Sequence, residues 1–191
     1  MSLRRREVVE KLLEKRGDLL VVAGLGSTAW DITAAGDADL NFPTWGAMGQ
    51  AAMLGLGIAL AQPKRRVLVI TGDGEMLMGL GSLATIGVQQ PKNLTVAVID
   101  NERYGETGMQ ATHTAHGVDL AAVAKACGFR NSEKILNEKD LRKIVHAAAG
   151  PNFLQIKVVA EKLPLVLPPH DGVHLKERFR KALADVLAKK R

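Results

Sequence analysis

The sequence predicts an α/β protein, a three-layer α/β/α sandwich in which helices cover both faces of a mainly parallel sheet of about five or six strands. Two apolar runs rich in β-branched residues, 67–71 and 94–99, show no polar alternation, as is typical of strands buried on both faces. Strands that alternate with helical segments favour parallel pairing. There is no internal repeat and no segment left over for a second core, so we expect a single domain over residues 1–191.

Each remaining element follows from its local pattern. A helix is expected at 3–16, where apolar residues fall on one face among many charges, and another at 174–189, where an apolar stripe recurs at helical spacing. Further helices are expected at 29–35, 50–62, 75–89, 119–127 and 140–149, and further strands at 19–23, 39–43, near Phe129 and at 153–159. In the last strand Gln155 and Lys157 alternate with apolar residues, which indicates a place nearer an edge of the sheet.

Composition and charge exclude several classes of protein. The formal net charge is +6, but the basic residues gather at the two ends, in 4–6 and 189–191, and aromatic residues make up only 4%. A nucleic-acid interface would need more stacking partners, so we interpret the two ends as solvated helix termini. A single cysteine, Cys127, excludes a disulfide framework and a cysteine-built metal site within the chain. We find no membrane-spanning run and no signal peptide, and we expect a cytoplasmic protein.

Polar side chains follow both buried strands at the points where these strands end. Asp73 lies between two glycines directly after the first strand, and Asn101 follows the second. A right-handed helical crossover brings the carboxyl ends of parallel strands to one edge of the sheet, where open α/β sheets bind ligands. A carboxylate, an amide oxygen and backbone carbonyls form a hard oxygen site. The sequence therefore predicts a Mg²⁺ site shared with the phosphates of a bound ligand.

The Gly72-Asp73-Gly74 turn, followed by residues 75–99 and an Asn-containing turn, resembles the diphosphate-binding motif of thiamine diphosphate (TPP) enzymes. That family usually ends its motif in Asn-Asn. Here Asp100 replaces the first Asn, whereas Asn101 retains the second. The resemblance implies that TPP binds through Mg²⁺ and that the metal ligands are the side chains of Asp73 and Asn101 and the carbonyl of Arg103.

Two turns earlier in the sequence are also candidates for cofactor contacts. Residues 24–28 could hold an anion on free N–H groups or form an ordinary helix cap. Residues 46–49 alone would be a simple helix entry, but the resemblance implies that the Gly46 carbonyl binds the aminopyrimidine ring and that Met48 bends the cofactor. The cofactor contacts expected from the resemblance are Gly26, Ser27, Thr28, Gly46, Met48, Gly72, Asp73, Gly74, Glu75, Asn101, Arg103 and Tyr104.

The stretch 102–117 lacks periodicity and follows a ligand-binding strand end, so we interpret it as an active-site loop. Its run at 107–112 resembles the TG-x-Q-x-T run of phosphonopyruvate and sulfopyruvate decarboxylases. The candidate catalytic residues in the stretch 102–117 are His113, Glu106 and Gln110. A loop histidine is most often simply solvated, so a proton-donating role for His113 stays one of two interpretations. The resemblance suggests a 2-oxo acid substrate with a second anionic group, met by Arg103 or His113.

The resemblance also implies that part of the active site lies on a second protein chain. In this family a second domain supplies the glutamate that activates the aminopyrimidine ring, and every glutamate here belongs to a segment already assigned. The chain thus resembles the β subunit of a split 2-oxo acid decarboxylase whose partner is a pyrimidine-binding α subunit. We expect a hetero-oligomer with two or more copies, docked through the small-residue helices 50–62 and 75–89.

The same residues leave other functions open. A subunit of an acetolactate synthase-like carboligase, or of an unassigned 2-oxo acid decarboxylase, would use the same cofactor. A non-catalytic TPP-binding module would hold the cofactor without turnover. A ferredoxin-linked oxidoreductase subunit is disfavoured, because Cys127 alone cannot hold an iron–sulfur cluster.

Overall fold

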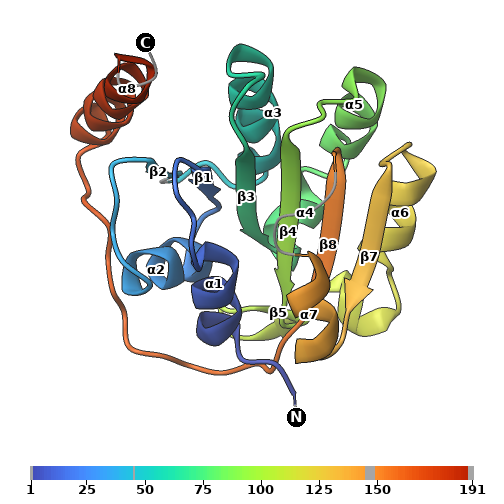
Figure 1. Cartoon of the computed structure of the whole chain (residues 1–191). Coiled ribbons are helices and arrows are strands. Elements are labelled where there is room, and N and C mark those ends of the chain that lie inside the picture. The colour runs from blue at the N-terminus through green and yellow to red at the C-terminus, as the bar shows by residue number, and fades with distance from the viewer. Residues whose placement is uncertain (1, 45, 145–148, 189–191) are drawn as a thin grey trace.

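A computed structural model describes residues 2–44, 46–144 and 149–188 and confirms the predicted α/β architecture. Six strands form one parallel sheet in the order β2-β1-β3-β4-β8-β7, with helices on both faces (Figure 1). The strands are β1 (Leu20–Ala23), β2 (Asn41–Pro43), β3 (Val67–Gly72), β4 (Leu94–Asp100), β7 (Asn131–Ile135) and β8 (Asn152–Lys157). Strands β3 and β4, predicted from their apolar runs, are central neighbours in register from Val67 opposite Leu94 to Gly72 opposite Ile99.

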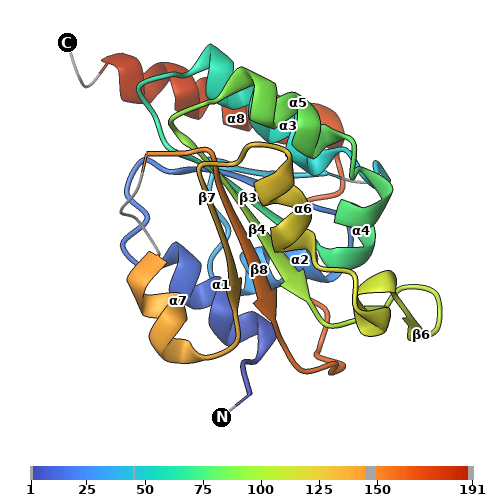
Figure 2. The same ribbon diagram turned by 90° about the vertical axis from the view of Figure 1, so that its right-hand side faces the viewer.

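The helices form two layers that are separated by the sheet (Figures 1 and 2). One layer contains α3 (Ala51–Ala61), α4 (Asp73–Met78), α5 (Ser82–Gln89) and α6 (Leu120–Ala126). The other contains α1 (Arg5–Leu13), α2 (Ser27–Ala34) and α7 (Glu138–Ile144). The C-terminal helix α8 (Gly172–Ala188) packs at the β2 edge, where Phe179 meets Phe42 edge to face with ring centroids 5.4 Å apart.

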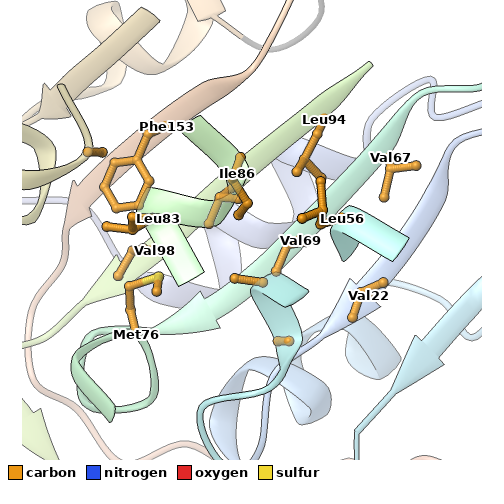
Figure 3. Packing of buried hydrophobic residues seen from close by; sticks show 14 of the residues in the cluster. Val22, Leu56, Val67, Val69, Met76, Leu83, Ile86, Leu94, Val98 and Phe153 are labelled. Carbon is orange, nitrogen blue, oxygen red and sulfur yellow. The ribbon is translucent and has the colours of Figure 1, made fainter. Parts of the chain in front are cut away.

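Alternating strand residues divide the core between these layers. Val67 and Val69 join the cluster under α3 and α5, whereas Leu68 and Ile70 join the cluster under α1 and α2. Figure 3 shows part of the first cluster. Helix α3 lies very close to the sheet, because a Cβ atom on Gly55 would fall 2.2 Å from Val69 Cγ2. Gly55 therefore serves close packing of this helix on the sheet, whereas a Cβ atom on Gly57 would meet nothing within 4 Å.

The helix expected at 75–89 is instead two helices, α4 and α5, which are separated at Gly79–Gly81. Gly79 lies against the backbone of Gly49, since a Cβ atom there would be 2.2 Å from the Gly49 carbonyl oxygen. The prediction of one helix was wrong because this close backbone contact, between segments distant in sequence, interrupts the helix.

The stretch 102–117 contains more structure than predicted. A short hairpin of β5 (Arg103–Tyr104) and β6 (Gln110–Ala111) is followed by the 3₁₀-helix η1 (His113–His116). Figure 2 shows this segment beyond the carboxyl ends of the central strands. Two-residue strands carry too short a pattern to be recognised in a sequence.

Two strands predicted from the sequence match the structure in place but differ in detail. The strand expected near Phe129 is β7, which begins at Asn131, whereas Phe129 itself is a buried core residue. Strand β8 lies between β4 and the edge strand β7, near an edge as predicted, but its Gln155 is fully buried. Its polar residues have partners inside the protein, as described below.

Parts of two helix predictions fall outside the described residues. Helix α7 ends at Ile144, and positions 145–148 of the expected helix 140–149 are not described; the same holds for position 189 of the expected helix 174–189. Within the described ranges, no helix combines the length and the apolar character needed to cross a bilayer.

Candidate functional site

A cleft of about 460 Å³ opens at the carboxyl ends of β3 and β4. It lies at the edge where parallel α/β sheets bind their ligands. The lining includes most of the residues predicted to contact a cofactor: Ser27, Met48, Gly72, Asp73, Gly74, Glu75, Asn101, Arg103 and Tyr104. Segments far apart in the sequence therefore converge on one place, as the spacing of the motifs predicted.

Asp73 is the first residue of α4 and is only 2% exposed. Its Oδ2 atom accepts hydrogen bonds from the hydroxyls of Thr112 at 2.5 Å and Thr114 at 3.2 Å. Burial raises the pKa of Asp73 to about 6; the negative charge of Asp100 adds to the shift, and the threonine hydroxyls oppose it. Among the described residues no basic side chain forms an ion pair with Asp73. A buried carboxylate without a cationic partner is suited to a bound cation.

Asn101 and Arg103 complete the candidate metal site. The Asn101 Oδ1 atom accepts a hydrogen bond from the Arg103 amide at 2.9 Å, which fixes the turn after β4. An amide oxygen has a second lone pair for a cation. No group of three His, Cys, Asp or Glu side chains that could hold a metal occurs in the described part of the chain. The candidate set is thus one carboxylate with amide and carbonyl oxygens, a donor set suited to Mg²⁺.

Asp100, the residue that departs from the family's motif, is fully buried and well paired. It accepts hydrogen bonds from Gln155 Nε2 at 2.6 Å, Lys157 Nζ at 3.0 Å and Thr114 Oγ1 at 2.8 Å. Burial alone would lower the pKa of Lys157, but its bonds to Glu102 and Asp100 outweigh burial and raise it. The polar residues of β8, Gln155 and Lys157, thus compensate this buried carboxylate.

The Glu75 side chain connects three segments around the cleft. Its carboxylate accepts from the Thr71 hydroxyl at 2.7 Å, the Leu25 amide at 3.0 Å and the Ala51 amide at 3.4 Å. Burial raises the pKa of Glu75, and these donors oppose the shift. A Cβ atom on Gly24 would lie 1.8 Å from Glu75 Oε2, so this position requires glycine. The side chain thus holds the site together, and only its backbone amide is available for a cofactor.

The basic N-terminus is not merely a solvated helix terminus, and that prediction was wrong for Arg5. Arg5 lines the cleft, is 3% exposed, pairs with the buried Asp31 and donates to the Ser27 carbonyl at 3.3 Å. Arg6 Nε also reaches Asp31, at 3.0 Å. Burial raises the pKa of Asp31, and the two arginines oppose the shift. Packing of α1 on α2 brings these charges together, and no local pattern in either helix reveals it.

Of the three candidate catalytic residues, only Glu106 lines the cleft. A Cβ atom on Gly26 would lie 2.9 Å from Glu106 Oε1, so the glutamate lies against the turn that begins α2. Burial raises the pKa of Glu106, and the charge of Arg5 opposes it. Gln110 and His113 are exposed and lie outside the lining; Gln110 Nε2 donates to the Thr107 carbonyl at 3.2 Å.

Three predicted cofactor contacts, Gly26, Thr28 and Gly46, also lie outside the lining. The Thr28 hydroxyl is buried and donates to the Gly24 carbonyl at 3.0 Å. Gly46 is exposed with φ of +65°, beside position 45, which is not described. Their roles toward a cofactor stay predictions.

The proline-punctuated segment after β8 forms part of the cleft, which the sequence did not predict. Figure 1 shows it passing below α1 and α2 toward α8. Glu161, Lys162, Leu163 and Leu165 are lining residues of this segment. It is held by an ion pair of Glu161 with Arg4 and by a hydrogen bond from Arg6 Nη2 to the Pro164 carbonyl at 2.9 Å. Prolines favour an extended path, but only the fold places that path beside the site.

Comparison with known proteins relates this geometry to one family. The family model "Thiamine pyrophosphate enzyme, C-terminal TPP binding domain" matches residues 32–158. Sulfopyruvate decarboxylase subunit beta from Methanocaldococcus jannaschii is 35% identical, over 94% of this chain and 97% of that protein. Phosphonopyruvate decarboxylase from Streptomyces viridochromogenes is 40% identical, over 92% of this chain and 45% of that protein. The solved benzoylformate decarboxylase from Polynucleobacter necessarius shares the fold, with a TM-score of 0.69 and 22% identity over 86% of this chain and 35% of that one.

Proposed function

This chain belongs to the thiamine pyrophosphate enzymes, and on that premise we propose that it is the diphosphate-binding subunit of a split TPP-dependent 2-oxo acid decarboxylase. The observation that carries the proposal is that Asp73 and Asn101 line the same cleft. The chain that contains them matches a decarboxylase subunit beta over nearly its whole length. The phosphonopyruvate decarboxylase aligns with this chain over less than half of its own length. That difference supports a division of the enzyme between two chains.

The residues at the cleft suit the cofactor in a specific way. Mg²⁺ would be held by the side chains of Asp73 and Asn101 and by the Arg103 carbonyl, and the buried charge of Asp73 gives a reason for a cation there. The diphosphate would meet the amides of Gly74 and Glu75 at the start of α4. Met48, which lines the cleft, would press against the cofactor and hold it bent. When bound, thiamine diphosphate supplies the nucleophilic carbon and the electron sink for loss of carbon dioxide.

The substrate we propose is a 2-oxo acid with a second anionic group, such as sulfopyruvate or phosphonopyruvate. Of the two side chains considered for that group, Arg103 lies at the cleft and His113 does not. Arg103 Nη1 donates to the Glu102 carbonyl at 2.9 Å, which orients the guanidinium and leaves further donors for an anion. Arg103 is therefore the better candidate on this chain.

The partner we propose is a pyrimidine-binding α subunit that supplies the activating glutamate. On this chain Glu75 is engaged with backbone amides, and Glu106 lies against the α2 turn. A docking face is available on the α3 and α5 side, where several apolar side chains are exposed: Met53, Leu60, Met78 and Val88. An assembly with two copies of each chain would cover this face.

The test is reconstitution. The chain is purified alone and together with a candidate α subunit, and carbon dioxide release is followed with TPP, Mg²⁺ and sulfopyruvate, phosphonopyruvate or pyruvate. We expect turnover only when both subunits are present, with the highest kcat/KM for a 2-oxo acid that carries a second anionic group. Substantial turnover by the isolated chain would refute the split arrangement, and a clear preference for pyruvate would refute the substrate class. TPP binding without turnover by any pair would favour a non-catalytic module.

A further inference from the structure

Two buried threonines, Thr112 and Thr114, lie behind the candidate metal carboxylate. Both come from the segment that follows β6, and they are 0% and 6% exposed, whereas His113 between them is exposed. We propose that they are positioning residues: Thr112 orients Asp73 for the cation, and the two threonines together fasten the loop 103–116 to Asp73 and Asp100. This inference rests on the proposed function and assigns a role to the last threonine of the TG-x-Q-x-T run.

The contacts favour one orientation of the Asp73 carboxylate. Both hydroxyls approach the same atom, Oδ2, at 2.5 Å for Thr112 and 3.2 Å for Thr114. A carboxylate whose one oxygen is fixed by hydrogen bonds presents its other oxygen in a defined direction, which is how residues behind metal ligands usually act. Oδ1 is therefore the oxygen available to Mg²⁺.

Counting protons shows that Asp73 has fewer side-chain donors than Asp100. Each threonine hydroxyl has a single proton to donate. The shortest contacts assign the Thr112 proton to Asp73 and the Thr114 proton to Asp100, which it reaches at 2.8 Å. Asp100 has Gln155 and Lys157 as additional donors, whereas Asp73 has no amide or ammonium side chain as a donor in the described part of the chain. Lys157 thus balances the negative charge of Asp100, and a cation bound at Asp73 would balance the charge of the second carboxylate.

The same threonines link the loop to the sheet. The Thr112 amide donates to the Glu102 carbonyl at 3.0 Å, which brings the two ends of the loop together. The hydroxyl of the same threonine donates to Asp73. The hairpin between these points, which carries Glu106 and Gln110, is mostly exposed. With few buried contacts of its own, it depends on this anchor for local stability. Binding of the cation at Asp73 would strengthen the anchor and so order the loop over the substrate.

The test uses three variants of the full chain assembled with its partner subunit. Thr112→Val replaces the hydroxyl by a methyl group of similar size, Thr112→Ser keeps the hydroxyl, and Thr33→Val is a matched control on α2. The Thr33 hydroxyl donates to the Ala29 carbonyl at 2.8 Å, away from the cleft. Mn²⁺ affinity in the presence of TPP is measured by the electron paramagnetic resonance signal of the free ion. We expect Thr112→Val to weaken Mn²⁺ binding by about 10- to 100-fold, with Thr112→Ser near wild type and Thr33→Val unchanged.

Hydrogen exchange of residues 105–117 gives a second readout that a merely structural threonine would not change. In wild type, Mg²⁺ with TPP should slow exchange in this segment; in Thr112→Val it should not, even when metal and cofactor saturate the site. Mn²⁺ affinity and loop protection equal to those of Thr33→Val would overturn the inference. If Thr112→Val fails to fold, Thr112→Ala replaces it, since alanine also lacks the hydroxyl that donates to Asp73, with the same expected and refuting results. Absence of cofactor binding by wild type would instead refute the proposed function.

Discussion

Replacing Arg5 by methionine tests the largest departure of the structure from the sequence-based prediction. Methionine keeps most of the apolar stem and removes the guanidinium that pairs with Asp31 and donates to the Ser27 carbonyl. Both partners of the ion pair are almost inaccessible to solvent, with side-chain exposures of 4% and 1%. Removing one partner of a buried pair leaves the other charge in a medium of low polarity, at a cost of about 3–5 kcal/mol.

The structure sets the expected value at the lower end of that range, because Arg6 still reaches Asp31 at 3.0 Å. We expect Arg5→Met to lower the free energy of unfolding by about 3 kcal/mol. For a chain of this size that corresponds to a fall in Tm of about 6–12 °C. Urea unfolding of the full chain, followed by circular dichroism, gives the free energy directly.

The neighbouring Arg4 provides the matched control. Its side chain is 55% exposed, but its partner Glu161 is only 11% exposed, so Arg4→Met should lower the free energy of unfolding by about 1–2 kcal/mol, less than Arg5→Met. Equal effects of the two substitutions would refute the assignment of Arg5 as a buried ion-pair partner beside the cleft.

Four further outcomes are expected. Asp73→Asn should weaken TPP binding in the presence of Mg²⁺ by at least about tenfold while leaving the fold intact, because the carboxylate charge is lost; unchanged affinity in calorimetric titration would remove Asp73 from the metal site. Amides of residues 106–113 should exchange rapidly in the isolated chain and slowly with cofactor and partner, and protection equal to that of β4 without them would contradict this expectation. Lys157→Met should lower the free energy of unfolding by about 2 kcal/mol, because it removes a charged donor from the buried Asp100, and an unchanged urea midpoint would argue against that pairing. Val88→Glu, at a site 81% exposed on α5, should weaken assembly with the α subunit in light-scattering measurements, whereas Val173→Glu on α8, 65% exposed, should not; equal assembly by both would argue against the α3 and α5 face.

The sequence predicted those parts of the fold that depend on local pattern. The apolar runs at β3 and β4 identified the centre of the sheet, and the polar residues that follow them identified its ligand-binding edge. The rule that parallel strands end on one edge then predicts that Asp73 and Asn101 lie together. Their position at one cleft required nothing beyond two strands, one crossover and the residues at the strand ends.

The parts that the sequence did not predict depend on contacts between distant segments. The break at Gly79 comes from the backbone of Gly49, and the burial of Arg5 comes from Asp31 on another helix. A short-range pattern contains neither partner. In both cases a residue that looks ordinary in its own segment, a helical glycine or a terminal arginine, acquires its role from the packing of another element.

The departure from the family's Asn-Asn motif illustrates how such a contact can explain a residue. An aspartate at position 100 places a second negative charge near Asp73, which raises the pKa of Asp73 and disfavours two ionised carboxylates side by side. Lys157, on the adjacent strand and directly opposite Asp100 in the register, compensates that charge. Lys157 is not a lining residue of the cleft, so it neutralises Asp100 without occupying the position of a cation at Asp73. A buried acid that carries its own lysine can therefore replace asparagine here, and the charge left for Mg²⁺ to meet is that of Asp73 alone.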